Sequence, residues 1–268
     1  MAQYYYLVAG LPDILQGIPK KGLLYDQVID EINDELTEQD RTLLELIRYR
    51  FDCDNLASIL EGKSDFDNRG VFNRLELEQE ISSPDEVPAF MQEFLEYKKE
   101  GKEFFPGLGL KEQILVGYYG TLLENENQFV QEWASFELDL LNLIAARSAK
   151  GLGLSPEKSV IPLNDNAEKF AKSSAADFGV SGHINWLDAV LSNFSTPKKL
   201  EMAIDTIRWQ KADELCDGCW FGVEEVLAFT VKFNTVARWM QLDPETGLTR
   251  LNDLLQSMKS MASKQNSN

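Results

Sequence analysis

A short stretch of sequence occurs twice in related form, and this repetition constrains the fold more than any other feature. Residues 45–56 read ELIRYRFDCDNL and residues 132–143 read EWASFELDLLNL. An internal repeat is typical of folds that are built from similar units, each packed against its neighbours. We therefore predict a protein made of related units. Besides the flanking glutamate and leucine, the matched positions are Tyr49 and Phe136, Asp52 and Asp139, and Asn55 and Asn142.

Both copies have the residue spacing of an amphipathic helix. Their apolar side chains recur at intervals of three, four or seven residues, which places them on one side of a helix with 3.6 residues per turn. Asp52 and Asn55 share another face of the first helix, as Asp139 and Asn142 do in the second, where they can bond a neighbouring backbone group. Neither residue type favours a helix interior, so its presence in both copies indicates a retained contact.

A fainter third copy has the sequence FTVKFNTVARWM, near the end of the chain. When Phe233 is aligned with Tyr49 and Phe136, the aspartate and asparagine positions hold Val236 and Trp239. Amphipathic helices also resemble one another by chance, and this alternative stays open for all three copies.

The remaining sequence also predicts helices. Thr37 is a suitable N-cap, with Asp40 in the first turn, for a helix that runs to Leu60. Ser83 and Pro84 predict another helix start, as N-cap and first helical residue. A long helical stretch is predicted over residues 110–150. Further helices are predicted over residues 25–36, 184–194, 196–215, 223–240 and 248–261.

Strand signals are scarce, and the sequence therefore predicts the all-α class. Residues 4–9 fit either a buried strand or the first turns of a buried helix, but no alternation or hairpin dipeptide follows. We predict a helical bundle of two to three pseudo-repeated units. The predicted divisions are a first helical unit at residues 1–75, a second at 76–155, a third at 156–262 and a disordered tail at 263–268.

The charge of the chain excludes several classes of partner. Forty-four acidic residues against 26 basic ones give a formal net charge of −18. Nucleic acids and anionic lipid surfaces would be repelled, since both bind proteins through Lys and Arg. The three cysteines are too few for a disulfide framework, and no apolar run approaches the roughly 20 residues that cross a bilayer. We therefore expect a soluble, cytoplasmic protein.

Residues suited to catalysis or metal binding are few. His183 is the only histidine, which excludes a His-rich zinc site and the paired ligands of a di-iron bundle. Cys216 and Cys219 have the spacing of a zinc or redox pair, but zinc would need Cys53 and His183 as well. Two half-buried thiols at a helix break are the simpler interpretation. We predict no catalytic residue, no cofactor and no metal site, and an enzyme using carboxylates or this cysteine pair stays an alternative.

Three segments resemble the C subunit, also called d, of archaeal and vacuolar-type rotary ATPases. They are Tyr49 to Leu56, Phe136 to Arg147, and the stretch FGVEEVLAF at residues 221–229, which is similar to the opening of that family's last long helix. The start, YYYLVAGLP, is similar to an uncharacterised bacterial family associated with such ATPase operons. The chain departs from the family in being shorter and in having Trp239 where the family has asparagine.

The resemblance implies a mechanical role in ion transport. Members of the C subunit family consist of three related all-helical domains around a pseudo-threefold axis, and they join the central stalk to the membrane proteolipid ring. A chain with this role would be a non-catalytic adaptor with partners in the stalk and the ring, held at the membrane through proteins alone. A generic helical scaffold for protein interactions is the alternative function.

Overall fold

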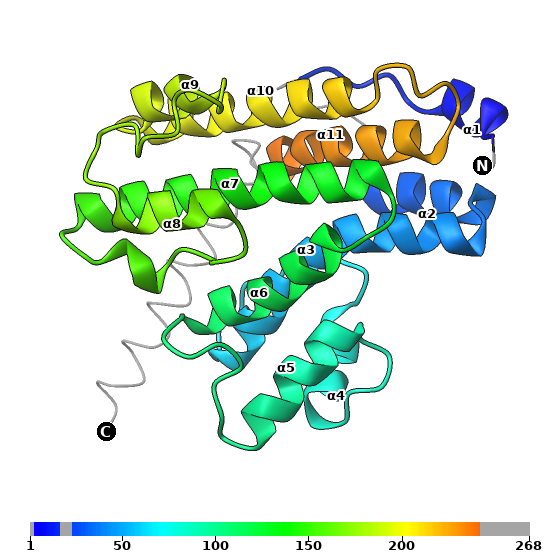
Figure 1. Ribbon diagram of the computed structural model, residues 1–268. Coiled ribbons are helices and arrows are strands. Elements are labelled where there is room, and N and C mark those ends of the chain that lie inside the picture. The colour runs from blue at the N-terminus through cyan, green and yellow to red at the C-terminus, as the bar shows by residue number, and fades with distance from the viewer. Residues whose placement is uncertain (1–2, 17–22, 242–268) are drawn as a thin grey trace, which may run out of the picture.

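The computed structural model describes residues 3–16 and 23–241, and every regular element in these ranges is helical (Figure 1). The predicted all-α class is confirmed. The helices are α1 (Tyr5–Gly10), α2 (Tyr25–Glu35), α3 (Glu38–Leu60), α4 (Arg74–Ser82), α5 (Ala89–Lys99), α6 (Leu110–Leu123), α7 (Gln128–Gly151), α8 (Asp165–Lys172), α9 (Leu187–Asn193), α10 (Pro197–Leu215) and α11 (Val223–Gln241), with a 3₁₀ turn at Pro156–Lys158.

The helices α2 and α3 lie where the sequence predicts them. The Thr37 hydroxyl caps α3 by accepting a hydrogen bond from the Asp40 backbone N–H at 3.3 Å. Val28, Ile29 and Ile32 form the buried face of α2. Local capping and apolar spacing therefore suffice to place these two helices.

The helix predicted to start at Ser83 and Pro84 begins later, at Ala89, so this prediction is wrong. The Glu80 carboxylate, at the end of α4, accepts hydrogen bonds from three successive backbone N–H groups. These groups belong to residues 85–87, which fold around Glu80 as a turn. A side chain from the preceding helix thus satisfies the donors that a new helix would have left open.

The helical stretch predicted over residues 110–150 is present, but a break that was not predicted divides it into two helices, α6 and α7. The break falls in the sequence ENEN at residues 124–127. Asn125 accepts a hydrogen bond from the Asn127 backbone N–H at 2.8 Å, and Asn127 caps α7 by accepting from the Val130 N–H at 3.1 Å. Asparagine side chains compete with the helix for backbone donors, which explains the interruption.

The start of the chain, which fits either a strand or a helix by sequence, forms the short helix α1. Tyr4 precedes it and is buried, and its backbone N–H donates to the Phe221 carbonyl at 2.7 Å. The start therefore lies against the turn between α10 and α11. The predicted helix at residues 248–261 and the predicted tail at 263–268 lie outside the described residues.

Long helices from all three predicted units pack on one another. The helix α3 contacts α6, α11 and α7, and α10 contacts α11, α9 and α7. Figure 1 shows α10 alongside both α11 and α7, with α4 and α5 at the far end. Buried apolar side chains from Tyr4 to Val236 form one connected cluster, and the division into three units stays a prediction. None of the described helices is long and apolar enough to cross a bilayer.

Candidate functional site

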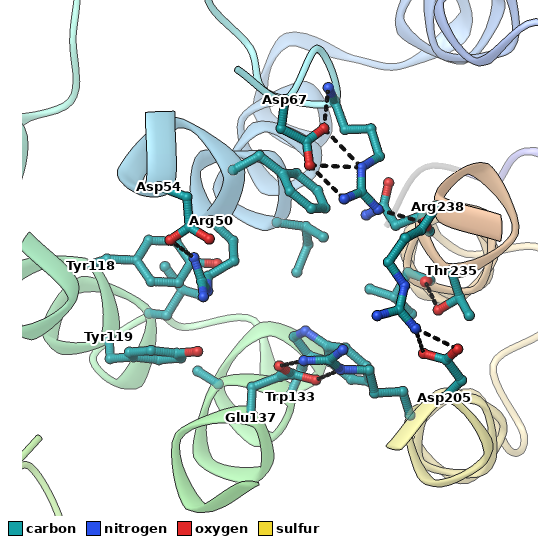
Figure 2. A pocket seen from close by; sticks show the side chains of 18 residues that line it. Arg50, Asp54, Asp67, Tyr118, Tyr119, Trp133, Glu137, Asp205, Thr235 and Arg238 are labelled. Carbon is teal, nitrogen blue, oxygen red and sulfur yellow. Dashed lines mark hydrogen bonds and ion pairs between the residues drawn. The ribbon is translucent and has the colours of Figure 1, made fainter. Parts of the chain in front are cut away.

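The helices that carry the three motif copies, α3, α7 and α11, border a common cavity of about 220 Å³ (Figure 2). Side chains from α6 and α10 complete its wall, including Tyr118 and Tyr119 of α6. Because the cavity lies where segments far apart in sequence converge, it is the natural candidate for a functional site.

Two positions of the repeat line this cavity in all three copies. One lies two residues before the motif aromatic residue, and the other lies directly after it. The residues at these positions are Ile47, Ala134 and Val231, and Arg50, Glu137 and Asn234. The three segments therefore present corresponding positions to one cavity.

Four arginines and four carboxylates line the cavity, so their formal charges cancel. Each arginine is paired, and two of the four pairs join different helices. Arg208 of α10 binds both carboxylate oxygens of Glu137 on α7, at 2.6 and 2.8 Å. The other pairs are Arg50 with Asp54 at 2.5 Å, Arg69 with Asp67 at 2.5 Å, and Arg238 with Asp205 at 2.6 Å.

These pairs hold charge in a confined space. Asp205 is 3% exposed and Glu137 is 9% exposed. Burial by itself lowers the pKa of the Arg208 guanidinium, but the Glu137 carboxylate outweighs this effect and the pKa is raised. Burial raises the pKa of Asp54, and Arg50 and Lys111 together outweigh it, so that pKa is lowered. The Arg208–Glu137 pair joins α10 to α7 and the Arg238–Asp205 pair joins α11 to α10, so these two pairs tie walls of the cavity together.

The two motif asparagines fix the loops that follow their helices, and they do so with the same pair of hydrogen bonds. The Asn55 side-chain amide donates to the Asp67 carbonyl at 2.8 Å, and its oxygen accepts from the Asp67 N–H at 2.7 Å. Asn142 makes the equivalent bonds to Ile161, at 2.9 and 2.8 Å. In both copies one side-chain amide thus satisfies both the N–H and the carbonyl of a single loop residue, as a paired strand would do.

The two motif aspartates hold the segments that come after these loops. Asp52 is fully buried and accepts backbone N–H bonds from Val71 at 2.7 Å and Phe72 at 3.2 Å. Burial raises the pKa of Asp52 to about 6. Asp139 accepts instead from the side-chain amides of Asn164 at 2.9 Å and Asn166 at 2.8 Å. Burial also raises the pKa of Asp139.

The motif aromatic residues are buried behind the cavity wall. The ring of Tyr49 stacks on Phe72 at 6.1 Å, and that of Phe136 meets Trp186 edge-on at 5.6 Å. In the third copy, Phe233 is fully buried and stacks on Tyr25 at 5.2 Å. The predicted motif residues are thus structural supports, and the cavity residues beside them were not predicted. The sequence signal that could have found these cavity residues is their position directly after each motif aromatic residue.

The third copy keeps the aromatic residue but uses different polar contacts. Val236, at the aspartate position, is fully buried in the apolar cluster. Trp239, at the asparagine position, donates its indole N–H to Asp205 of α10 at 2.7 Å. In α3 and α7 the residue at this position binds the loop that follows the helix, whereas in α11 it binds the neighbouring helix α10.

The remaining candidates for chemistry lie apart from the cavity. Cys216 and Cys219 are half-buried free thiols in the turn after α10, and burial raises the pKa of each. His183 is exposed, with its Nε2 atom 2.9 Å from the Asn166 side-chain oxygen. Across the described ranges, no three His, Cys, Asp or Glu side chains are grouped so that they could hold a metal ion.

The fold and site define an all-helical protein in which three long helices enclose a charged but balanced cavity. The chain belongs to the DUF2764 family, described as a protein family of unknown function, whose model matches residues 1–262. No curated protein and no solved structure matches the chain.

Proposed function

We propose that the chain is a non-catalytic adaptor of a V/A-type rotary ATPase, linking the central stalk to the membrane proteolipid ring. The observation that supports this most strongly is the cavity, which corresponding positions of α3, α7 and α11 line together. A part that passes torque along an axis needs a central socket surrounded by similar units.

The contacts around the cavity also suit a part that bears load. Asn55 and Asn142 each fix a loop through two hydrogen bonds, and Arg208 bridges α10 to α7 through Glu137. Packed cores and satisfied polar networks resist deformation. In this proposal the cavity receives side chains from the foot of the stalk, and the chain reaches the membrane through the proteolipid ring.

Co-purification tests the adaptor role. A tagged full-length chain is expressed in its native cells, and complexes are extracted from membranes in mild detergent. Recovery of ATPase head subunits together with the proteolipid supports the adaptor. Their absence, with other proteins recovered reproducibly in their place, supports the generic scaffold and contradicts the adaptor.

A cavity variant tests the socket. Ala134 is fully buried and lines the cavity, so Ala134→Phe places a ring in the open space. We expect this variant to fold and to recover less of the stalk than the wild-type chain does. Ala189→Phe, at an exposed position of α9, is the matched control and should recover the normal amount. Equal recovery by both variants would show that the stalk binds elsewhere.

A further inference from the structure

Three consecutive tyrosines at the start of the chain have three different environments. Tyr4 is buried, and its hydroxyl binds Thr37 and Asp40 at the start of α3. The ring of Tyr5 packs on Phe221 with the centroids 4.7 Å apart. Tyr6 is 95% exposed. The helix α1 is therefore anchored on one side, and it holds the third ring out toward solvent.

Beside Tyr6 lies a groove between α1 and α2, which we call the α1–α2 groove. It encloses about 360 Å³, near the lower end of the range of about 300–1,000 Å³ for ligand pockets. Its apolar wall comes from Leu7 and Leu11 on one side and from Val28 and Ile32 on the other. The groove has room for one or two large side chains.

The rim of the α1–α2 groove is acidic. Glu31, Asp34 and Glu35 border it, and all three are exposed and form no ion pair with the described residues. Asp34 and Glu35 stand in the last turn of α2, where the negative end of the helix dipole disfavours them. No basic residue occurs in this helix. A cation from outside the fold would explain why three acids that pair with no described residue stand at this unfavourable place.

We propose that the α1–α2 groove binds a short basic segment of a partner protein. An apolar side chain of that segment enters between α1 and α2 and packs on Tyr6. Flanking Lys or Arg side chains pair with Glu31, Asp34 and Glu35. The same acids repel nucleic acid and anionic lipid, so a protein segment is the occupant that the charge favours. The groove goes beyond the adaptor role, since neither depends on the other.

Fluorescence anisotropy on the purified full-length chain tests the groove. The probe is a fluorescein-labelled peptide, Lys-Lys-Leu-Phe-Lys-Lys. Two comparison peptides replace either its lysines with glutamate or its Leu-Phe pair with Gly-Ser. We expect the probe to bind and both comparison peptides to bind at least tenfold more weakly, with binding falling as salt rises from about 50 to about 300 mM.

Variants of the chain locate the binding. The triple change Glu31→Gln, Asp34→Asn and Glu35→Gln should weaken probe binding about tenfold or more, and Tyr6→Ala about fivefold or more. All four positions are exposed, so the variants should fold. The matched control neutralises three other exposed acids, Glu93, Glu96 and Glu126. It should bind the probe as the wild-type chain does.

Three outcomes overturn the proposal. Equal weakening in the control shows nonspecific attraction to an acidic protein. Tighter probe binding by Lys20→Gln with Lys21→Gln, but not by the charge-matched control Lys98→Gln with Lys99→Gln, shows that the chain's own lysines occupy the groove. A dimer that the triple variant converts to a monomer shows that the occupant is a second copy. None of these outcomes changes what is expected from co-purification with ATPase subunits. The groove proposal and the adaptor proposal can therefore be contradicted independently.

Discussion

Asp52 and Asn55 provide hydrogen-bond partners for a loop that has no strand or helix of its own. Asn55 binds both polar groups of Asp67, and Asp52 binds the N–H groups of Val71 and Phe72. Buried backbone groups must find partners, so these two side chains decide the path of the chain after α3. The close approach of Gly70 to Asp52 follows from this arrangement.

Gly70→Ala should destabilise the fold. A Cβ atom at this position would lie 2.2 Å from the Asp52 carboxylate oxygen, which is itself held by two backbone donors. We expect a loss of about 2 kcal/mol in the free energy of unfolding, measured by urea denaturation, as for other overpacked sites. The control is Gly120→Ala in α6, where a Cβ would meet nothing within 4 Å and the helix should gain about 0.5–1 kcal/mol. Equal stability of both variants would contradict the expected clash.

Asp52→Asn should change how stability depends on pH. The pKa of the buried carboxyl is raised to about 6 from an ordinary value of 3.8, so the folded state takes up a proton that the unfolded state releases. The contribution of Asp52 to stability therefore falls as pH rises from about 4 to about 6, by about 3 kcal/mol. The asparagine side chain of the variant does not titrate, so the unfolding free energy of the variant minus that of wild type should rise by this amount. A difference that stays constant with pH contradicts the raised pKa.

At the scale of elements, local sequence predicts helices well until a side chain from elsewhere competes. Thr37 and Asp40 cap α3 as the sequence predicts, because both partners lie within one turn. The predicted start at Ser83 is wrong because Glu80 takes up the backbone donors that follow it. The sequence ENEN ends α6 although apolar spacing continues across it. Capping rules cannot anticipate a competing acceptor whose position depends on the fold.

Glu80→Ala should loosen the turn between α4 and α5. Glu80 is 8% exposed, and its removal leaves three backbone N–H groups without their acceptor. We expect the free energy of unfolding to fall by about 2 kcal/mol. Burial raises the pKa of Glu80, but the three donors together outweigh it and the pKa is lowered. The wild-type advantage is therefore present above the ordinary carboxyl range and is lost as pH falls through the folded-state pKa. Urea denaturation of Glu80→Ala and of the exposed control Glu96→Ala, at neutral and acidic pH, checks both statements.

At the scale of the whole molecule, the repeat in the sequence led to the right helices but not to the cavity between them. The motif residues Asp139 and Asn142 were predicted from the repeat, and they hold the segment after α7. Glu137 lies two residues before Asp139 in sequence, yet its partner Arg208 comes from α10. Pairing across helices depends on the three-dimensional arrangement, which one sequence alone does not reveal.

Breaking the Arg208–Glu137 pair should destabilise the fold. Arg208→Met leaves the buried Glu137 carboxylate without its bidentate partner. Losing one member of a fully buried pair costs about 3–5 kcal/mol. Arg208 keeps 34% of its side chain exposed to solvent, and the resulting screening should reduce the loss to about 2 kcal/mol.

The double variant Arg208→Met with Glu137→Leu removes both charges and should recover most of the lost stability, because no unpaired charge is then left in the cavity wall. Lys172→Met breaks the exposed pair with Glu168 and should change stability by less than about 0.5 kcal/mol. Thermal and urea unfolding of the wild-type chain, Arg208→Met, Glu137→Leu and the double variant completes the cycle, with Lys172→Met as the control. If the double variant is as unstable as Arg208→Met alone, then the loss reflects packing of the arginine stem rather than charge, and the pair does not tie α7 to α10.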